Sequence, residues 1–161
     1  MDKLWAPWRK GYILKKSHRG CFFCQKIKAP ASRDSKNLIL KRTPHSFSVL
    51  NLYPYNNGHL MVVPKKHVAT LDRLTETEQL DLLKLVNDTV KLLKRSLNPR
   101  GMNLGINMGR IGGAGVPGHI HIHLVPRWAG DTNFMPVTGN TKVISESLKS
   151  VYERLKKRIK K

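Results

Sequence analysis

The chain has 161 residues, 40% of them hydrophobic, which suits a single domain with an ordinary buried core. No stretch approaches the ~20 consecutive apolar residues of a membrane-spanning helix, and the first ten residues lack the apolar run of a signal peptide. We therefore expect a cytoplasmic protein with no membrane partner. The net charge of +20 predicts either a dedicated anionic partner or a solvated, lysine-rich surface. We favour the second interpretation, with at most weak, non-specific binding to nucleic acids.

The first predicted segment, residues 1–36, is an irregular arm that contains Cys21 and Cys24 in a C-x-x-C arrangement. In a cytosolic protein this spacing is more typical of a metal or redox site than of a structural disulfide. A thioredoxin-like redox site would place the two cysteines between a strand and a helix, and no such unit is evident here. The pattern therefore favours a metal site, provided that other ligands exist.

The next segments are short and extended. Strands are predicted over residues 38–41 and 46–51, and residues 53–58 carry strong turn signals. A third strand over residues 59–63 ends at Pro64.

A long helix is predicted to begin after Thr75, which forms a capping box with Glu78. Apolar residues recur every three or four positions and predict one buried stripe, formed by Leu80, Leu83, Val86, Val90, Leu93 and Leu97. The sequence Asn-Pro-Arg-Gly at residues 98–101 ends the helix.

Two further strands are predicted over residues 102–108 and 119–125, joined by a glycine-rich loop. A basic C-terminal helix over residues 143–161 follows, with one apolar stripe formed by Ile144, Leu148, Val151, Leu155 and Ile159. Adjacent strands with short connections and segregated helices indicate an α+β fold with a mainly antiparallel sheet.

Three histidines alternate with apolar residues in the last predicted strand. A strand with this pattern places His119, His121 and His123 on one face, where their rings can line a cleft. The alternatives are a plain surface strand or a three-histidine metal site. The preceding loop, residues 109–118, is rich in glycine, which lets a backbone approach phosphate oxygens closely. A glycine-rich loop that leads directly into such a strand favours a phosphate-cleaving site.

These motifs resemble a known family. The sequence His-Ile-His-Ile-His-Leu-Val-Pro-Arg at residues 119–127 is similar to the signature of the histidine triad (HIT) family, and residues 58–67 resemble its first half. Residues 4–9 and 127–136 resemble the bacterial diadenosine tetraphosphate phosphorylase-like branch. The resemblance implies a single HIT domain over 1–161, with a five-stranded, mainly antiparallel sheet, two principal helices and a homodimer that extends the sheet.

The resemblance also implies an enzyme that cleaves phosphoanhydride bonds in dinucleoside polyphosphates such as diadenosine tetraphosphate. His121 would be the nucleophile and form a nucleotidyl-histidine at the α-phosphorus. His123 would bind the α-phosphate and assist proton transfer, while His59 and His119 complete and orient the histidine cluster. Water as the second acceptor gives a hydrolase, and inorganic phosphate gives a phosphorylase.

Substrate contacts are expected on both halves of the chain. Asn51 matches the ribose-contacting asparagine of the family. Asn107, Arg110, Gly113 and Gly115 are candidates for phosphate or ribose contacts. Many family members carry Gly-Gln shortly before the triad, where this chain has Gly-Val-Pro-Gly at residues 115–118.

The resemblance implies a structural zinc site in which His67 and His119 join Cys21 and Cys24, with His18 or His45 as alternative ligands. Four protein ligands would close the coordination shell and leave no catalytic position. No organic cofactor is expected.

Two other functions remain open: a nucleoside phosphoramidate hydrolase, and a non-catalytic nucleotide- or RNA-binding module. The module would show aromatic residues among basic ones, and only 7% of the chain is aromatic.

Overall fold

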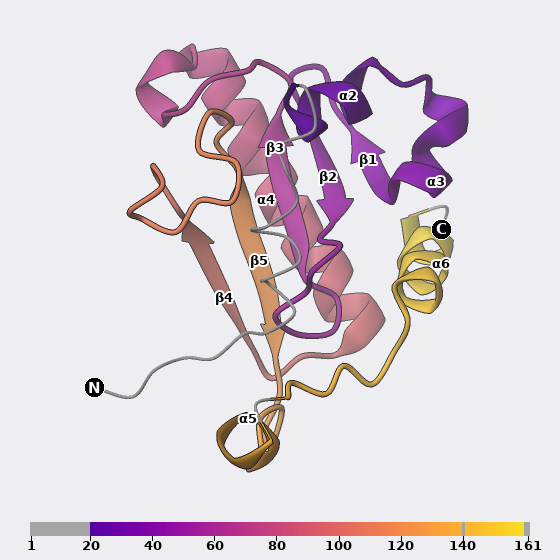
Figure 1. Ribbon diagram of the computed structural model, residues 1–161. Coiled ribbons are helices and arrows are strands. Elements are labelled where there is room, and N and C mark those ends of the chain that lie inside the picture. The colour runs from indigo at the N-terminus through magenta and orange to yellow at the C-terminus, as the bar shows by residue number, and fades with distance from the viewer. Residues whose placement is uncertain (1–19, 140, 160–161) are drawn as a thin grey trace.

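The computed structural model describes residues 20–139 and 141–159. Its centre is one five-stranded sheet with the order β1-β2-β3-β5-β4, in which each neighbouring pair is antiparallel (Figure 1). The strands are β1 (Ile39–Arg42), β2 (Ser46–Leu50), β3 (Leu60–Pro64), β4 (Gly101–Ile106) and β5 (Ile122–Arg127). The predicted α+β fold with a five-stranded antiparallel sheet is confirmed.

Five helices surround the sheet within the described part of the chain. They are α2 (Phe22–Lys28), α3 (Asp34–Asn37), α4 (Glu76–Leu97), α5 (Met135–Thr138) and α6 (Leu148–Ile159), with 3-10 turns at Ala31–Arg33 and Leu71–Arg73. None of them is long and apolar enough to cross a membrane. The segment over residues 1–36 was predicted to be an irregular arm. Its second half is largely helical, because it contains α2, the 3-10 turn at Ala31–Arg33 and most of α3. The motif at residues 4–9 and the alternative ligand His18 lie outside the described residues.

Helix α4 packs on one face of the sheet, against β2, β3 and β5 (Figure 1). Its predicted capping box is confirmed, because Thr75 Oγ1 accepts from the Glu78 amide at 3.3 Å and the Glu78 carboxylate accepts from the Thr75 amide at 2.8 Å. The predicted apolar stripe is partly wrong. Leu80 and Leu83 are 53% and 55% exposed. The buried face consists of Leu82, Leu85, Val86, Thr89, Leu92 and Leu93.

The helix contains enough leucines for two stripes to fit the helical period, which explains the error. Thr89 interrupts the apolar pattern of the face that is actually buried. Its hydroxyl is satisfied inside the helix, because it donates to the carbonyl oxygen of Leu85 at 2.7 Å. A polar residue can therefore occupy a core position at little cost, and the sequence pattern does not show this.

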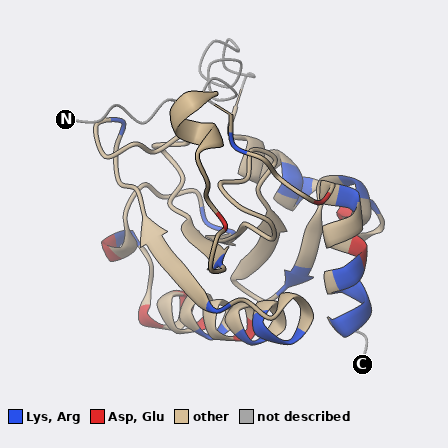
Figure 2. Ribbon diagram, turned by 90° about the horizontal axis from the view of Figure 1, so that it is seen from below, with Lys and Arg blue, Asp and Glu red and all other residues tan. Residues whose placement is uncertain are grey.

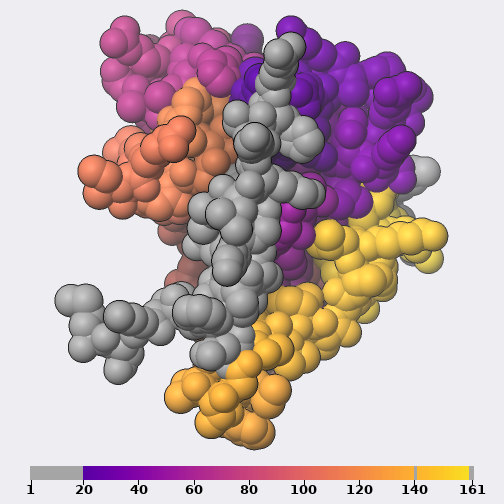
Figure 3. Space-filling view, in the orientation of Figure 1, coloured from indigo at the N-terminus to yellow at the C-terminus, as the bar shows by residue number. Residues whose placement is uncertain are grey.

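The opposite face of the sheet is covered in part by α2. Phe23, on this helix, packs with Ile39, Phe47, Val49, Met61 and Val63 in a second apolar cluster. On the α4 side of the sheet, α6 packs against α4 and β1, next to the N-terminal part of the described chain (Figure 3). Tyr152 and Lys156 of α6 donate to the carbonyl oxygens of Ile39 and Leu40 at 3.1 and 2.8 Å.

Most predicted boundaries differ by one or two residues, such as the end of β4 at Ile106 instead of residue 108, and two differ by more. The C-terminal helix begins at Leu148 instead of residue 143, because the Ser147 hydroxyl accepts from the Ser150 amide at 3.2 Å and caps it. Strand β5 begins at Ile122 instead of His119, because Ile122 pairs with Ile106, the last residue of β4. Upstream of that pair, the Ile120 amide donates to Val68 instead, at 2.7 Å.

Candidate active site and metal centre

Four histidines form a row along β3 and β5, from His59 just before β3 to His119, which contacts Pro64 at the end of β3. His59, His119, His121 and His123 are at most 9% exposed, so each buried ring nitrogen requires a partner. Adjacent rings in the row are close, with 4.8 Å between the centroids of His121 and His123 and 5.1 Å between those of His59 and His123. The structure thus brings the predicted catalytic histidines together.

The tautomer of His121 follows from one backbone contact. Its Nδ1 lies 2.9 Å from the carbonyl oxygen of His119. A carbonyl oxygen only accepts, so Nδ1 carries the hydrogen and the neutral ring has its lone pair on Nε2. Burial lowers the pKa of His121, although the bond to His119 opposes this shift. The surroundings of His121 thus supply a neutral imidazole with one defined lone pair.

His59 and His123 form a second defined pair. The Tyr55 amide donates to His59 Nδ1 at 3.1 Å, and an amide N–H only donates, so Nδ1 of His59 is the acceptor. His59 Nε2 therefore carries the hydrogen and donates to His123 Nδ1 at 2.9 Å. Burial, followed by the nearby His123 and His121, lowers the pKa of His59 to about 3. In the neutral state His123 then carries its own hydrogen on Nε2.

Glycine is required directly before His59. Gly58 has a φ of +72°, and a Cβ atom there would lie 2.4 Å from Leu97 Cδ1. A side chain at this position would be strained by the left-handed backbone conformation, and the end of the Leu97 side chain would have to move aside. The resemblance to the family included Gly58, and the structure supplies the physical reason for a glycine beside His59.

The two cysteines meet two histidines in one cluster, which consists of Cys21, Cys24, His67 and His119. Their ligand atoms all lie within 4.8 Å of one another. His119 Nδ1 lies 3.3 Å from Cys21 Sγ, 3.6 Å from Cys24 Sγ and 3.2 Å from His67 Nδ1. Cys24 Sγ lies 3.3 Å from His67 Nδ1. The arrangement can hold a metal ion. His67 and His119 are its only histidines among the described residues, so the alternative ligand His45 is not part of it.

An open groove borders the histidine cluster on the face of the sheet away from α4. It has a volume of about 510 Å³, and His123 and Asn107 are among the residues that line it. Asn107 Nδ2 also donates to the carbonyl oxygen of Gly113 at 3.4 Å, which ties the base of the glycine-rich loop to β4. Arg110 and Gly115 are exposed on that loop and do not line the groove.

Asn51 has an internal role in this structure. Its side-chain oxygen accepts from the Tyr53 amide at 3.0 Å, and its Nδ2 lies 3.3 Å from His59 Nδ1. These contacts place Asn51 behind His59, at the turn that holds the ring.

Two residues of the site were missed from the sequence. Tyr55 supplies the amide that fixes His59, and its ring lies 4.7 Å from that of His59, but the sequence shows it only as part of a turn. Phe23 packs against His119 and His121 at ring distances of 5.3 and 5.1 Å. Its position inside the C-x-x-C motif was the available signal, since a metal site that also includes His119 would bring Phe23 to the histidine cluster.

Comparison with known proteins shows the family. The sequence matches the HIT domain over residues 32–130. The chain belongs to the HIT family. This HIT protein is 36% identical over 155 residues to an AP-4-A phosphorylase of Mycobacterium tuberculosis, an alignment that covers 92% of this chain and 80% of the relative. It is also 32% identical over 115 residues to the adenosine 5'-monophosphoramidase HNT1 of Candida albicans, with 69% and 72% coverage.

Solved structures agree on the fold. A zinc-bound histidine triad family protein from Mycobacterium smegmatis superposes with a TM-score of 0.69 at 22% identity, covering 88% of this chain and 94% of its own. The histidine triad nucleotide-binding protein ST2152 from Sulfolobus tokodaii gives a TM-score of 0.68 at 25% identity, with 87% and 92% coverage. The HIT fold therefore extends over most of the chain, beyond the matched domain.

Proposed function

We propose that this HIT protein is an enzyme that cleaves phosphoanhydride bonds in dinucleoside polyphosphates, such as diadenosine tetraphosphate, through a nucleotidyl-histidine on His121. The observation that carries the proposal is the bond from His121 Nδ1 to the His119 carbonyl oxygen, which leaves Nε2 as the nucleophilic nitrogen. The 36% identity to the M. tuberculosis AP-4-A phosphorylase supports the substrate class.

In the first step, His121 Nε2 forms a bond to the α-phosphorus, and the bond from that phosphorus to the bridging oxygen breaks. The departing nucleotide takes its electron pair on that oxygen, and His123 Nε2–H stabilises the developing charge by donating a hydrogen bond. In the second step, an oxygen of water or inorganic phosphate attacks the same phosphorus, and the P–N bond breaks. The electron pair of the P–N bond returns to His121 Nε2, which takes up the acceptor's proton and then releases it to solvent, and His121 is regenerated.

His59 acts through His123. Its low pKa keeps the ring neutral, so its Nε2–H remains a donor to His123 Nδ1 and fixes the orientation of that ring.

For substrate binding we propose Asn107, on the groove, as a phosphate or ribose contact. Arg110, Gly113 and Gly115 would contact phosphate oxygens from the exposed loop. Asn51 would contact ribose in addition to its contacts with Tyr53 and His59.

A product experiment tests this function. The protein is incubated with diadenosine tetraphosphate, with and without inorganic phosphate, and the nucleotides are separated. ATP and ADP that appear only with phosphate establish a phosphorylase. AMP with ATP, without phosphate, establishes a hydrolase. Two ADP would instead show symmetric cleavage and would contradict attack at the α-phosphorus. The absence of any cleavage under both conditions would contradict the proposal.

Two alternatives share this site. The similarity to the C. albicans monophosphoramidase favours nucleoside phosphoramidate hydrolysis as the second candidate reaction. Cleavage of adenosine 5'-phosphoramidate with no activity on diadenosine tetraphosphate would support it. A nucleotide- or RNA-binding module without catalysis is disfavoured, because binding alone gives no reason for the fixed tautomer of His121.

We propose that the cluster of Cys21, Cys24, His67 and His119 holds a structural zinc ion. Tetrahedral zinc with bonds of about 2.0 to 2.3 Å places its ligand atoms roughly 3.3 to 3.8 Å apart, and the four short separations in the cluster lie close to that range. His119 Nε2 donates to the Pro64 carbonyl oxygen at 2.8 Å, so the lone pair of its neutral ring is on Nδ1, which faces the sulfurs. The ion would tie α2 to the catalytic segment.

We propose that the whole chain, residues 1–161, forms one HIT domain that acts as a cytoplasmic homodimer. Strand β4 is an edge strand, and its exposed Leu104 is followed by exposed Met108. A second copy paired there would extend the sheet and cover both side chains. The molecular mass in solution tests this assembly, and a monomer at micromolar concentration would contradict it.

A further inference from the structure

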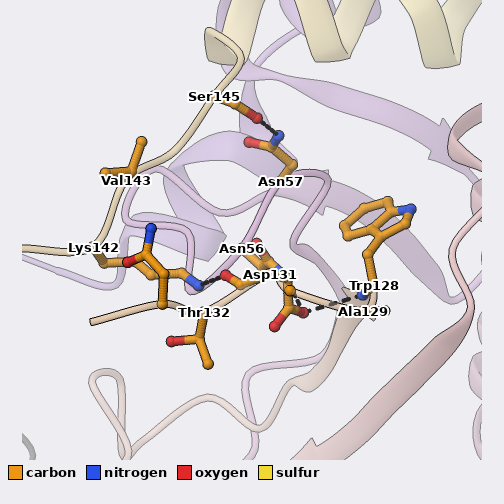
Figure 4. A pocket seen from close by; sticks show the side chains of 11 residues that line it. Asn56, Asn57, Trp128, Ala129, Asp131, Thr132, Lys142, Val143 and Ser145 are labelled. Atoms are coloured by element: carbon orange, nitrogen blue, oxygen red, sulfur yellow. Dashed lines mark hydrogen bonds between the residues drawn. The ribbon is translucent and has the colours of Figure 1, made fainter. Parts of the chain in front are cut away.

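A second cavity adjoins the groove that contains His123. It has a volume of about 400 Å³ and lies between the loop of residues 128–133 and the segment of residues 142–145 (Figure 4). The residues that line both spaces are Asn56, Asp131, Thr132 and Lys142. The groove and the cavity therefore share a wall. Both volumes fall within the range of about 300 to 1,000 Å³ that is typical of small-molecule sites.

Hydrogen bonds hold the shared wall in place. Asn56 is 8% exposed, and its Nδ2 donates to the Pro126 carbonyl oxygen at 3.0 Å and to Asp131 Oδ2 at 2.7 Å. The same carboxylate accepts from Arg127 Nε at 2.6 Å, and this guanidinium lowers the pKa of Asp131 to about 2. The wall is thus built before any ligand arrives, which reduces the cost of ordering it.

Lys142 brings a positive charge to the junction. Its ammonium donates to the backbone carbonyl oxygen of Asp131, on the loop that separates the two spaces (Figure 4). An ammonium has three N–H donors, and this bond uses one. The carboxylate of Asp131 is already paired with Arg127. A phosphate chain that passes from the groove into the second cavity would meet this ammonium.

The lining of the second cavity suits a nucleoside. Ala129 and Val143 supply apolar surface for a base, whereas Asn57 and Ser145, joined by a 2.6 Å hydrogen bond, supply amide and hydroxyl groups. Sites for small organic ligands commonly combine apolar surface with a few fixed polar groups in this way.

We propose that the second cavity binds the departing nucleoside of a dinucleoside polyphosphate, and that Lys142 binds the phosphate chain where it crosses between the two spaces. The inference rests on the proposed function, in which His121 and His123 hold the phosphate that is transferred. The remainder of the substrate then extends from His123 along the groove toward Lys142. A phosphoramidate has a small leaving group and does not reach the second cavity.

The test compares two substrates, diadenosine tetraphosphate and adenosine 5'-phosphoramidate, through the ratio of their kcat/KM values. Lys142→Gln removes the charge, and Ala129→Phe fills the second cavity, since Ala129 does not line the groove. Each variant should lower the ratio by about tenfold or more, the expected effect of losing a charge-assisted hydrogen bond or a subsite. Lys149→Gln and Ala31→Phe, exposed positions outside both spaces, are matched controls and should keep the ratio.

Binding of ATP, a nucleotide of the departing kind, gives a second readout by calorimetry, and Kd should rise in Lys142→Gln and Ala129→Phe but not in the controls. If circular dichroism shows that one variant is unfolded, the other carries the test. A wild-type protein that cleaves neither substrate overturns the proposed function. A wild-type protein that cleaves both, with unchanged ratios and ATP affinity in both variants, overturns the departing-nucleoside site alone.

Discussion

Backbone contacts give three similar histidines three different tasks. His119 donates to the Pro64 carbonyl oxygen, His121 donates to the His119 carbonyl oxygen, and His59 accepts from the Tyr55 amide. In each ring the contact fixes which nitrogen carries the hydrogen. The other nitrogen faces His123 in the case of His59 and, on our proposal, the zinc ion in the case of His119 and the substrate in the case of His121. The chemistry of each ring therefore depends on the backbone atom beside it.

The low pKa of His59 predicts a pH dependence of stability. Its pKa is about 3 in the folded protein and near 6.5 when unfolded, so the unfolded chain binds more protons between these values. The stabilisation is fully present above pH 6.5 and is lost as the pH falls toward 3, by roughly 4 to 5 kcal/mol over that window. Urea unfolding between pH 7 and pH 5 should show the first part of this loss.

The matched comparison uses two glutamine variants. His59→Gln lacks the buried titrating ring and should show a shallower fall in unfolding free energy between pH 7 and pH 5 than the wild type. His45→Gln, half-buried outside the histidine cluster, should keep the wild-type slope. Equal slopes for the wild type and His59→Gln would mean that His59 is not held neutral by its surroundings.

At the scale of elements, α2 and its N-cap residue Cys21 are joined to the histidine segment through the cluster of Cys21, Cys24, His67 and His119. The helix has seven residues, too few for stability in isolation. Cys21, at its N-cap, and Cys24 lie close to His67 and His119 from other parts of the chain. Its Phe23 is fully buried against the sheet and the histidine rings. A metal ion would therefore stabilise the fold at the point where α2 covers the active site.

We expect about one zinc per chain in protein prepared without chelators, as measured by elemental analysis. The double variant Cys21→Ser with Cys24→Ser should lower the melting temperature by about 6 to 12 °C, which corresponds to a loss of ~3 kcal/mol in a chain of this size. Catalysis at 25 °C should fall less, because His121 is not a ligand. The control variant Ser32→Ala, at an exposed position near α2, should leave both properties unchanged. Protein that contains no metal would contradict this prediction.

The elements with strong local signals could be predicted from the sequence. Pro64 and the turn at residues 53–58 define β3, and the Thr75 capping box defines the start of α4. The burial of Leu82 and exposure of Leu80 could not be predicted, because they depend on how α4 is rotated against the sheet. The start of β5 likewise depends on where its neighbour β4 ends, which is a tertiary fact.

The candidate site shows the same division. The residue types and spacing of the triad and the C-x-x-C motif predict a histidine cluster and a metal cluster, and the structure brings both together. The contributions of Tyr55, Asp131 and Lys142 come from a backbone amide, a salt bridge and a loop-to-loop contact. The first two contacts join residues four positions apart, Tyr55 with His59 and Arg127 with Asp131, but neither spacing forms a recognisable motif. The third contact joins Lys142 to a loop that only folding places beside it.

At the scale of the whole molecule, Lys and Arg side chains gather on α6 and the helices next to it within the described residues (Figure 2). Helix α6 ends in Lys156, Lys157 and Arg158, and only Lys156 among them makes a described bond to the sheet, to Leu40. This surface is separate from the groove at His123. We therefore expect it to attract polyanions loosely without taking part in cleavage.

The double variant Lys157→Gln with Arg158→Gln should elute earlier from a heparin column at low salt. It should also lower the slope of log binding constant against log salt for RNA by up to about 2, because two phosphate contacts are removed. Cleavage of diadenosine tetraphosphate should be unchanged within about twofold, since the histidine cluster lies elsewhere. Tight, sequence-selective RNA binding at physiological salt would instead show a dedicated nucleic-acid site.

The central claim, that His121 carries the transferred nucleotide, can be tested by trapping the intermediate. The protein is mixed with diadenosine tetraphosphate without inorganic phosphate, quenched in alkaline denaturant that preserves a P–N bond, and digested for mass spectrometry. We predict an adenylyl group on the peptide that contains His121. The His121→Ala variant should lack it, still bind the substrate, and lose several kcal/mol of transition-state stabilisation, where each ~1.4 kcal/mol is tenfold in rate. Adenylylation at another residue, or a His121→Ala variant that keeps more than about a tenth of wild-type activity, would contradict the account.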